Sequence, residues 1–177
     1  MDALTILKYP DPRLRRVAKR ITELTDEILE RIPLMFEAMR EDNGIGLAAP
    51  QVGWNVRLFV MNCSGEPDDD QVLLNPVITE RVGRGTMEEG CLSLPGVFAK
   101  VERPTRIVVE AVDLEGDSIS VEADGLVARC IQHELDHLEG VLFIDKVSPA
   151  RRGKIKKPLA QLKEDYKQSP ATDSIPA

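Results

Sequence analysis

QHELDHLEG, residues 132–140, contains both histidines of the chain, four positions apart, with a glutamate directly after the first. The residues from 126 to 139 carry helix signals, and Gly140 ends the run. Residues four apart on a helix lie on the same face, so His133 and His137 can direct both imidazoles at one ion. Glu134 projects beside that ion, where it can hold a water molecule, as in H-E-x-x-H metal sites. The alternative is a surface helix that carries two histidines by chance, and we favour the metal site.

The ion needs a third ligand, and the sequence offers several candidates. A third histidine is excluded, because Phe143 stands where the extended H-E-x-x-H-x-x-G-x-x-H pattern requires it. Cys130 lies on the histidine face of the helix, but about 7 Å along the axis from the expected height of the metal, and its short side chain cannot reach that far. We interpret it as apolar lining near the site. Glu164 would suit a thermolysin-like site, whereas Glu88 and Glu89 have no particular geometry.

Cys91, within EEGCLSLPG (88–96), is the strongest candidate for the third ligand. Gly90 precedes it and lets the backbone come close to whatever the thiolate binds. Taken alone, such a cysteine is more simply a packed thiol at a strand end. Together with H-E-x-x-H, it favours a ligand.

GIGLAAPQ, residues 44–51, follows the amphipathic helix predicted at about 28–39 and consists mostly of small residues. It is no phosphate loop, since the Lys-Ser/Thr ending is missing. A tight turn is the plain interpretation, but Gln51 offers an amide donor suited to a developing oxyanion.

Length and composition indicate one globular domain. The chain has 177 residues, of which 42% are hydrophobic and 30% charged. Apolar runs fall short of the roughly 18 residues that a membrane span needs. Three cysteines without a disulfide framework, and no secretory pattern at the N-terminus, favour a cytoplasmic location.

The net charge of −7 argues against general nucleic-acid binding, but the charge is unevenly distributed. Between residues 146 and 167 there are eight Lys or Arg and two acidic residues. Such a segment could contact an anionic partner, although a solvated helix face is the commoner explanation.

The hydrophobic patterns predict helices at both ends of the chain and strands between them. Helices are expected at 11–19, about 28–39, 126–139 and about 149–167, the last one with an interruption at Pro158. Strands are expected at 56–62, 72–79, 106–113 and 118–124. We therefore expect an α+β fold, with antiparallel or mixed sheets packed around the metal-binding helix. Residues 1–167 would form a single catalytic domain and 168–177 a disordered tail.

GIGLAAPQ, EGCLS and QHELDH, in this order and with this spacing, resemble the three signature motifs of the bacterial-type peptide deformylases. The similarity extends through YPDPRLR, LLNP, ADGL and GVLF, and covers about residues 4–150. The resemblance implies a hydrolase that removes the formyl group from N-formylmethionyl nascent chains and releases formate.

The resemblance also implies roles for individual residues. Cys91, His133 and His137 would hold one divalent metal ion, with Glu134 as general base and then acid. Gln51 and the backbone N–H of Leu92 would stabilise the oxyanion.

Further positions match those that surround the substrate in the family. Gly46 would leave room for the extended backbone of the peptide substrate. Gly90 would leave room for that backbone to approach the metal. The methionine side chain would lie among Ile45, Met87, Leu126, Arg129, Cys130 and His133.

Two features depart from the better-known bacterial pattern. Arg129 stands where an aliphatic residue is frequent, so its stem is expected to line the pocket while its guanidinium reaches solvent. Val97 and Phe98 follow CLSLP where many relatives carry a basic residue, which replaces a polar peptide contact with an apolar one.

The ligand set alone would suit zinc, whereas the resemblance implies Fe²⁺, with Zn²⁺, Ni²⁺ or Co²⁺ as substitutes. It further implies a monomer whose basic C-terminal segment docks on the ribosome, and no membrane partner. Two rival classes stay open: a thermolysin-like metallopeptidase with Glu164 as third ligand, and a non-catalytic zinc-binding module.

Overall fold

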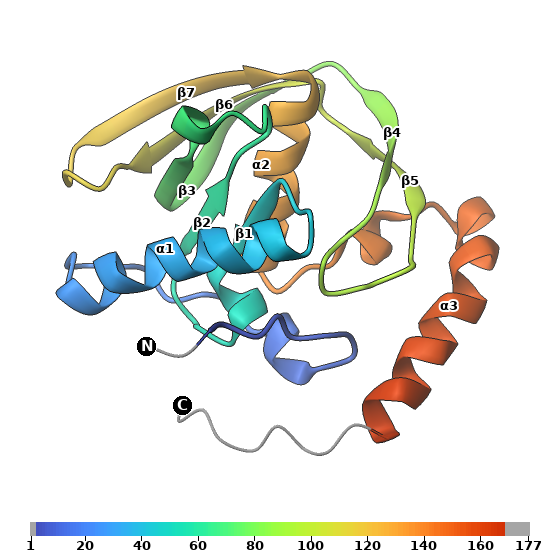
Figure 1. Ribbon diagram of the computed structural model, residues 1–177. Coiled ribbons are helices and arrows are strands. Elements are labelled where there is room, and N and C mark those ends of the chain that lie inside the picture. The colour runs from blue at the N-terminus through green and yellow to red at the C-terminus, as the bar shows by residue number, and fades with distance from the viewer. Residues whose placement is uncertain (1–2, 169–177) are drawn as a thin grey trace.

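The structure, a computed structural model, describes residues 3–168, and its largest layer is a five-stranded antiparallel sheet (Figure 1). The strands lie in the order β1-β2-β3-β6-β7. Their bounds are β1 (Gly46–Ala48), β2 (Leu58–Met61), β3 (Gln71–Val82), β6 (Arg106–Val112) and β7 (Ser118–Asp124). The strands β4 (Gly85–Glu89) and β5 (Ala99–Arg103) form a separate antiparallel hairpin.

Three α-helices accompany the strands within residues 3–168, namely α1 (Asp26–Glu41), α2 (Gly125–Leu138) and α3 (Pro149–Gln168). Four short 3₁₀ helices lie between them: η1 (Pro12–Arg15), η2 (Ala49–Val52), η3 (Pro67–Asp69) and η4 (Phe143–Lys146). Helix α2, which bears both histidines, contacts β1, β2, β6 and β7. Antiparallel strands packed around this helix confirm the predicted α+β fold.

Strand β2 shows why two helices enclose one end of the sheet. Leu58 and Val60 join the buried cluster that contains the apolar face of α1, whereas Phe59 and Met61 join the cluster around α2. Successive side chains of a strand point to opposite faces, so an uninterrupted apolar strand requires cover on both sides. Helix α1 lies in front of β1 and β2 in Figure 1, and α2 lies behind them.

The C-terminal end of α2 is fixed against the N-terminal segment of the chain. Gly140 has a φ of +69°, and a Cβ there would lie 2.5 Å from the carbonyl oxygen of Arg15, so a glycine is required. Nearby, the backbone N–H of Ala18 donates to the carbonyl of Leu138 at 2.8 Å. These contacts set the position of the histidine helix.

A third apolar cluster supports the hairpin and α3. Its buried members come from the N-terminal segment, the loop after Cys91, strand β5, the segment around η4, and α3. They are Leu7, Leu14, Leu94, Val97, Ala99, Val101, Leu142, Phe143, Ile144, Val147 and Ile155.

The helix predicted at 11–19 is wrong beyond its first turn. Only η1 forms, capped by Asp11, whose carboxylate accepts a hydrogen bond from the N–H of Arg13. After it the backbone bonds to distant segments: Ala18 to Leu138, and Lys19 to Asn55 at 3.1 Å. These tertiary hydrogen bonds replace the helical ones.

The other predicted elements form at or near their expected positions, but three strands were not predicted. β1 has only three residues, β4 (GTMEE) is mostly exposed and polar, and β5 (AKVER) turns an arginine inward. Helix α3 continues through Pro158 without the expected interruption. The predicted tail lies outside the described residues except for Gln168, which belongs to α3. No helix within residues 3–168 is both long and apolar enough to cross a membrane.

Candidate metal centre and active site

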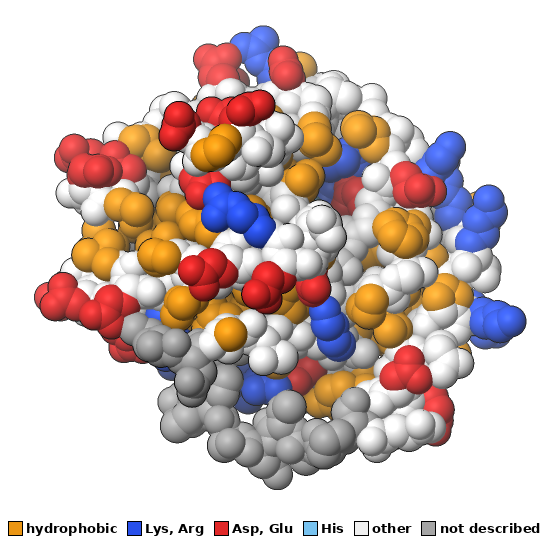
Figure 2. Space-filling model, in the orientation of Figure 1, with side chains coloured by type: hydrophobic (Ala, Val, Ile, Leu, Met, Phe, Trp, Pro, Cys, Tyr) orange, Lys and Arg blue, Asp and Glu red, His pale blue; other side chains and the backbone are white. Residues whose placement is uncertain are grey.

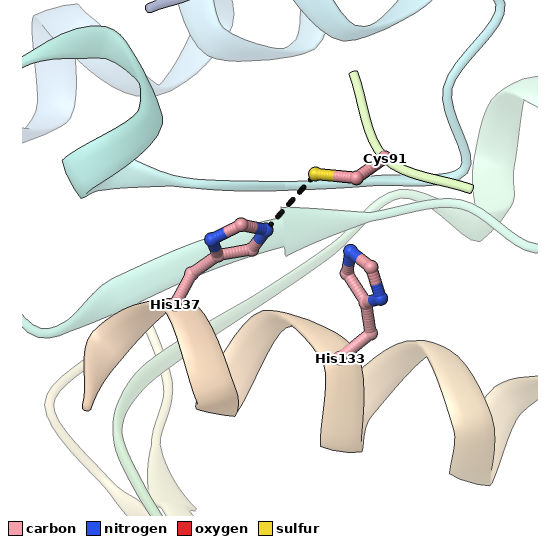
Figure 3. Close-up of side chains that lie close together, drawn as sticks. All are labelled: Cys91, His133 and His137. Atoms are coloured by element: carbon pink, nitrogen blue, oxygen red, sulfur yellow. Dashed lines mark hydrogen bonds between the residues drawn. The ribbon is translucent and has the colours of Figure 1, made fainter. Parts of the chain in front are cut away.

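Cys91, His133 and His137 come together at one point of the fold (Figure 3). One potential ligand atom from each lies within 4.8 Å of the other two. The Sγ of Cys91 is 3.2 Å from Nε2 of His137. Both imidazoles project from α2, and Cys91 lies two residues after the end of β4. The structure thus brings together the three residues that the sequence assigned to the metal.

These three side chains have the chemistry that a divalent transition metal needs. Two imidazoles and a thiolate form a common three-ligand set that leaves a position for water or substrate. Burial lowers the pKa of His137 well below its ordinary value, which keeps its imidazole neutral, the form that binds metals. Phe143 packs its ring against that of His133, with 6.0 Å between centroids. The residues present therefore fit the metal that the sequence predicted.

The other candidates for the third ligand lie elsewhere. Cys130 is buried on α2, and its thiol donates to the carbonyl of Ile45 at 3.5 Å. Glu164 is exposed on α3, where it accepts hydrogen bonds from Lys167 and Gln168. Neither belongs to the group of potential ligands found among residues 3–168.

Glu89 is a residue whose importance the sequence did not reveal. Its Oε2 lies 3.1 Å from Nδ1 of His133, a contact that directs the other ring nitrogen toward Cys91. Arg103 donates to both oxygens of Glu89, through Nε at 2.6 Å and Nη2 at 2.9 Å. Asp136 accepts from Arg103 at 2.7 Å. Burial alone would raise the pKa of Glu89, but hydrogen bonds from Arg103 and His133 outweigh it and hold the pKa well below its usual range.

Glu134 is enclosed beside the two imidazoles. Its side chain is buried, and its Oε2 has no hydrogen-bond partner within the described part of the chain. Burial raises the pKa of Glu134 to about 7, which suits a proton acceptor near neutrality. A Cβ at Gly46 would lie 2.6 Å from its Oε1 and 2.8 Å from the Sγ of Cys130. A side chain at position 46 would therefore collide with the carboxylate of Glu134, and glycine avoids this collision.

Gln51 is held with its amide nitrogen toward the ligands. Its Oε1 accepts a hydrogen bond from the N–H of Ala48 at 2.8 Å, which fixes the orientation of the amide. Its Nε2 donates to Ser93 at 3.1 Å and lies 3.6 Å from the Sγ of Cys91. Leu92 follows the cysteine, and its carbonyl accepts from Lys8 at 2.9 Å.

A cavity of about 620 Å³ opens over this group, a volume typical of small-ligand sites. Most of the predicted site residues line it. They are Ile45, Gly46, Gln51, Gly90, Cys91, Leu92, Leu126, Arg129, Cys130, His133 and Glu134. Met87 is not among the lining residues; it is 43% exposed on β4. The roles of all these residues in catalysis and substrate binding stay predictions.

The structure shows where the residues that depart from the better-known bacterial pattern lie. The expectation that the guanidinium of Arg129 reaches solvent is wrong: Arg129 is 6% exposed and donates to Glu89 at 2.6 Å. Val97 is fully buried in the third cluster and is not among the residues that line the cavity. Phe98 is 61% exposed and lines the cavity, where its ring covers Gly90.

Comparison with known proteins agrees with this geometry. The sequence model of the polypeptide deformylase family matches residues 3–153. The chain therefore belongs to the polypeptide deformylase family. It is 47% identical to a peptide deformylase of Acinetobacter baumannii over 163 residues, which cover 92% of this chain and 93% of that relative. It is 49% identical to one from Hydrogenovibrio crunogenus over 165 residues, covering 91% and 98%.

Solved structures of the family share the whole fold. A plant peptide deformylase superposes with a TM-score of 0.91 at 41% identity, covering 95% of this chain and 93% of its own. One from Plasmodium falciparum gives 0.89 at 38% identity, covering 97% and 100%. The resemblance stated from the three motifs is confirmed, and neither the thermolysin-like nor the non-catalytic class is supported.

Proposed function

We propose that this chain is a metal-dependent hydrolase that removes the formyl group from N-formylmethionyl nascent polypeptides and releases formate. The observation that carries the proposal is the meeting of Cys91, His133 and His137 within 4.8 Å. Beside them lies a buried carboxylate, that of Glu134, and over them a cavity large enough for a peptide N-terminus.

Cys91, His133 and His137 would hold the metal ion. When bound, a divalent ion supplies a Lewis acid that polarises the formyl carbonyl and makes a water molecule more acidic. Glu89 would keep the imidazole of His133 in the orientation and tautomer required, since its carboxylate occupies the Nδ1 side of the ring.

Glu134 would carry the proton through the reaction. It accepts a proton from the attacking water, whose oxygen adds to the formyl carbon, and then donates that proton to the leaving nitrogen as the C–N bond breaks. The products are formate and a peptide with a free amino terminus. A buried carboxylate with an unpartnered oxygen is suited to both steps.

Gln51 and the N–H of Leu92 would stabilise the negative charge that develops on the formyl oxygen. The amide of Gln51 is already oriented by Ala48, so little reorganisation is needed during the reaction. Gly46 would receive the extended peptide backbone, and Ile45, Leu126 and Arg129 would surround the first side chain.

The physiological metal is proposed to be Fe²⁺, with Zn²⁺, Ni²⁺ or Co²⁺ as substitutes. Purification without oxygen, followed by metal analysis and reconstitution with each ion, tests this assignment. We expect activity lost in air to return on anaerobic reconstitution with Fe²⁺. Equal activity of an air-stable zinc form would contradict it.

Helix α3 is proposed to contact ribosomal RNA, in a monomer that works in the cytoplasm on nascent chains. Its basic residues lie on an exposed surface, and Figure 2 shows Lys and Arg side chains along the edge of the molecule over α3. They include Arg151, Arg152, Lys154, Lys156 and Lys157. Co-sedimentation with ribosomes at low salt should decrease when these five are neutralised. Unchanged co-sedimentation would refute the contact.

Formate release from formyl-Met peptides, measured together with bound metal, tests the proposed function directly. Cys91→Ala should lose both metal and formate release, whereas Glu164→Ala should keep both. Loss of metal in the Glu164 variant instead would favour a thermolysin-like site.

A further inference from the structure

Arg129 forms hydrogen bonds that connect α2, β4 and β5 at the wall of the cavity. It lies on α2, four residues before His133, and is 6% exposed. Its Nη1 donates to Oε1 of Glu89 at 2.6 Å and to the carbonyl of Val101 at 3.1 Å. Its Nη2 donates to the carbonyl of Gly85 at 2.9 Å. One guanidinium thus links the histidine helix to both strands of the β4–β5 hairpin.

Few side chains of β4 contact the rest of the protein. Glu89 is the one side chain of β4 that is buried; Thr86, Met87 and Glu88 are exposed. The strand pairs only with β5 among the described residues, and an isolated two-stranded hairpin is marginally stable. Figure 1 shows the hairpin standing apart from the five-stranded sheet. The fork of Arg129, together with the contact between Glu89 and His133, therefore joins β4 to α2.

The position of β4 determines the shape of the cavity. Glu88 and Glu89 on this strand and Gly90 and Cys91 after it line one side, and α2 lines another. A shift of β4 away from α2 would widen the space between these two sides.

Arg129 also completes the charge balance behind His133. Arg103 is shared between two buried carboxylates, those of Glu89 and Asp136. Arg129 provides a second buried cation next to Glu89. The negative charge of Glu89 is therefore balanced by more than the guanidinium of Arg103, which Asp136 shares. Removal of one partner from a buried ionic group leaves an uncompensated charge and is strongly destabilising.

We propose that Arg129 is a positioning residue that fixes β4 against α2 and thereby sets the selectivity of the cavity for the first side chain of the substrate. The inference rests on the proposed function, because it names what determines substrate choice in the same site. A planar fork is needed for this role, since one group must reach a carboxylate and two carbonyl oxygens on separate strands.

Two substitutions separate the charge of Arg129 from its fork. Arg129→Lys keeps a cation near Glu89 but loses the fork, and Arg129→Leu removes both. The matched control is Arg106→Leu, which removes an exposed arginine paired with Glu122 at 2.6 Å, away from the cavity. The readouts are kcat/KM for formyl-Met and formyl-Phe peptides, metal retained after dialysis, and amide hydrogen exchange of residues 85–89.

In both Arg129 variants, the preference for formyl-Met over formyl-Phe should fall about tenfold, the scale of discrimination by pocket shape. Exchange of the β4 amides should accelerate in both. The Lys variant should retain metal better than the Leu variant, and Arg106→Leu should match the wild type in every readout.

The proposal is overturned if Arg129→Lys keeps the wild-type preference and the wild-type exchange of β4. An equal slowing of both substrates with the preference intact would likewise reduce Arg129 to a structural role. If Arg129→Leu does not fold, the Lys variant alone decides. Absence of formate release from the wild type would refute the proposed function, while the exchange of β4 would still test the attachment.

Discussion

Glu134 and His133 are adjacent in the sequence, but their side chains have opposite surroundings. His133 has Glu89 on one ring nitrogen and the ligand group on the other side. Glu134 has one oxygen, Oε2, with no protein partner among residues 3–168, and the absence of a side chain at Gly46 leaves room for its other oxygen, Oε1. A buried carboxylate with a free oxygen can exchange protons with a bound substrate, whereas one saturated by hydrogen bonds cannot.

Glu134→Gln should retain metal and lose turnover. The amide has nearly the same shape but cannot accept and return a proton, so formate release should fall at least about a hundredfold. Formate release at equal metal content is the measurement, and Glu164→Gln on exposed α3 is the control. Activity within tenfold of the wild type would show that another group carries the proton.

Gly46→Ala should fold but lose most activity. The new methyl would lie 2.6 Å from Oε1 of Glu134, so the carboxylate must move. Displacement of a reacting group by about 1 Å can lower a rate by about a hundredfold. Gly153→Ala on α3, where a Cβ meets nothing within 4 Å, is the control, and kcat with thermal stability is the readout. Unchanged kcat in the Gly46 variant would mean that Glu134 adjusts freely.

At the scale of elements, local sequence patterns were sufficient to predict α1, α2, α3 and four of the five strands of the main sheet. Helix α2 carries a regular apolar pattern over 14 residues, and β2 is a short uninterrupted apolar run. The ligand set followed from residue types and their order, because His133 and His137 are joined by a helix and Cys91 belongs to a separate motif.

The hairpin and the ionic group behind the metal could not be predicted in this way. Glu89 is 14 residues from Arg103 and 40 from Arg129, and no local pattern records these contacts. Arginine is usually exposed, which is why Arg129 was expected to reach solvent. The alternation of AKVER, with Arg103 at an inward position, was the available sign that a buried carboxylate would face β5.

Helix α3 contains a proline, Pro158, in its interior, where proline destabilises a helix. Pro158 lacks the N–H that an interior helical residue donates and crowds the carbonyl four residues earlier, an effect of about 3 kcal/mol. Ile155 is the one fully buried side chain of α3. Pro158→Ala should therefore slow amide exchange in residues 159–168 at least about tenfold, with little change in Tm, because α3 opens locally.

The control for this prediction is Pro149→Ala. Pro149 is the first residue of α3, where the missing N–H has no helical partner to lose. Its replacement should leave the exchange of α3 unchanged. Equal slowing in both variants would mean that general flexibility, rather than the helical position of Pro158, limits the opening.

At the scale of the whole molecule, the metal site adds a link between two parts of the fold that the ionic group around Glu89 also connects. His133 and His137 belong to α2, which packs on the main sheet. Cys91 packs at the edge of the third cluster, with the hairpin, the N-terminal segment and α3. A metal ion held by all three would therefore act as a cross-link between the two parts.

Metal removal should accordingly lower the stability of the whole protein, beyond its effect on activity. A ligand present at 100 times its Kd stabilises the folded state by about 2.7 kcal/mol. For a protein of this size that corresponds to a loss of about 5–10 °C in Tm on chelation. Cys91→Ser should begin with a lower Tm and lose less on chelation, because one side of the cross-link is already weakened. Cys63→Ser, a half-buried cysteine outside the ligand group, should show the same loss as the wild type. If chelation lowered Tm equally in both serine variants, the ion would not be bridging the hairpin and α2 through Cys91.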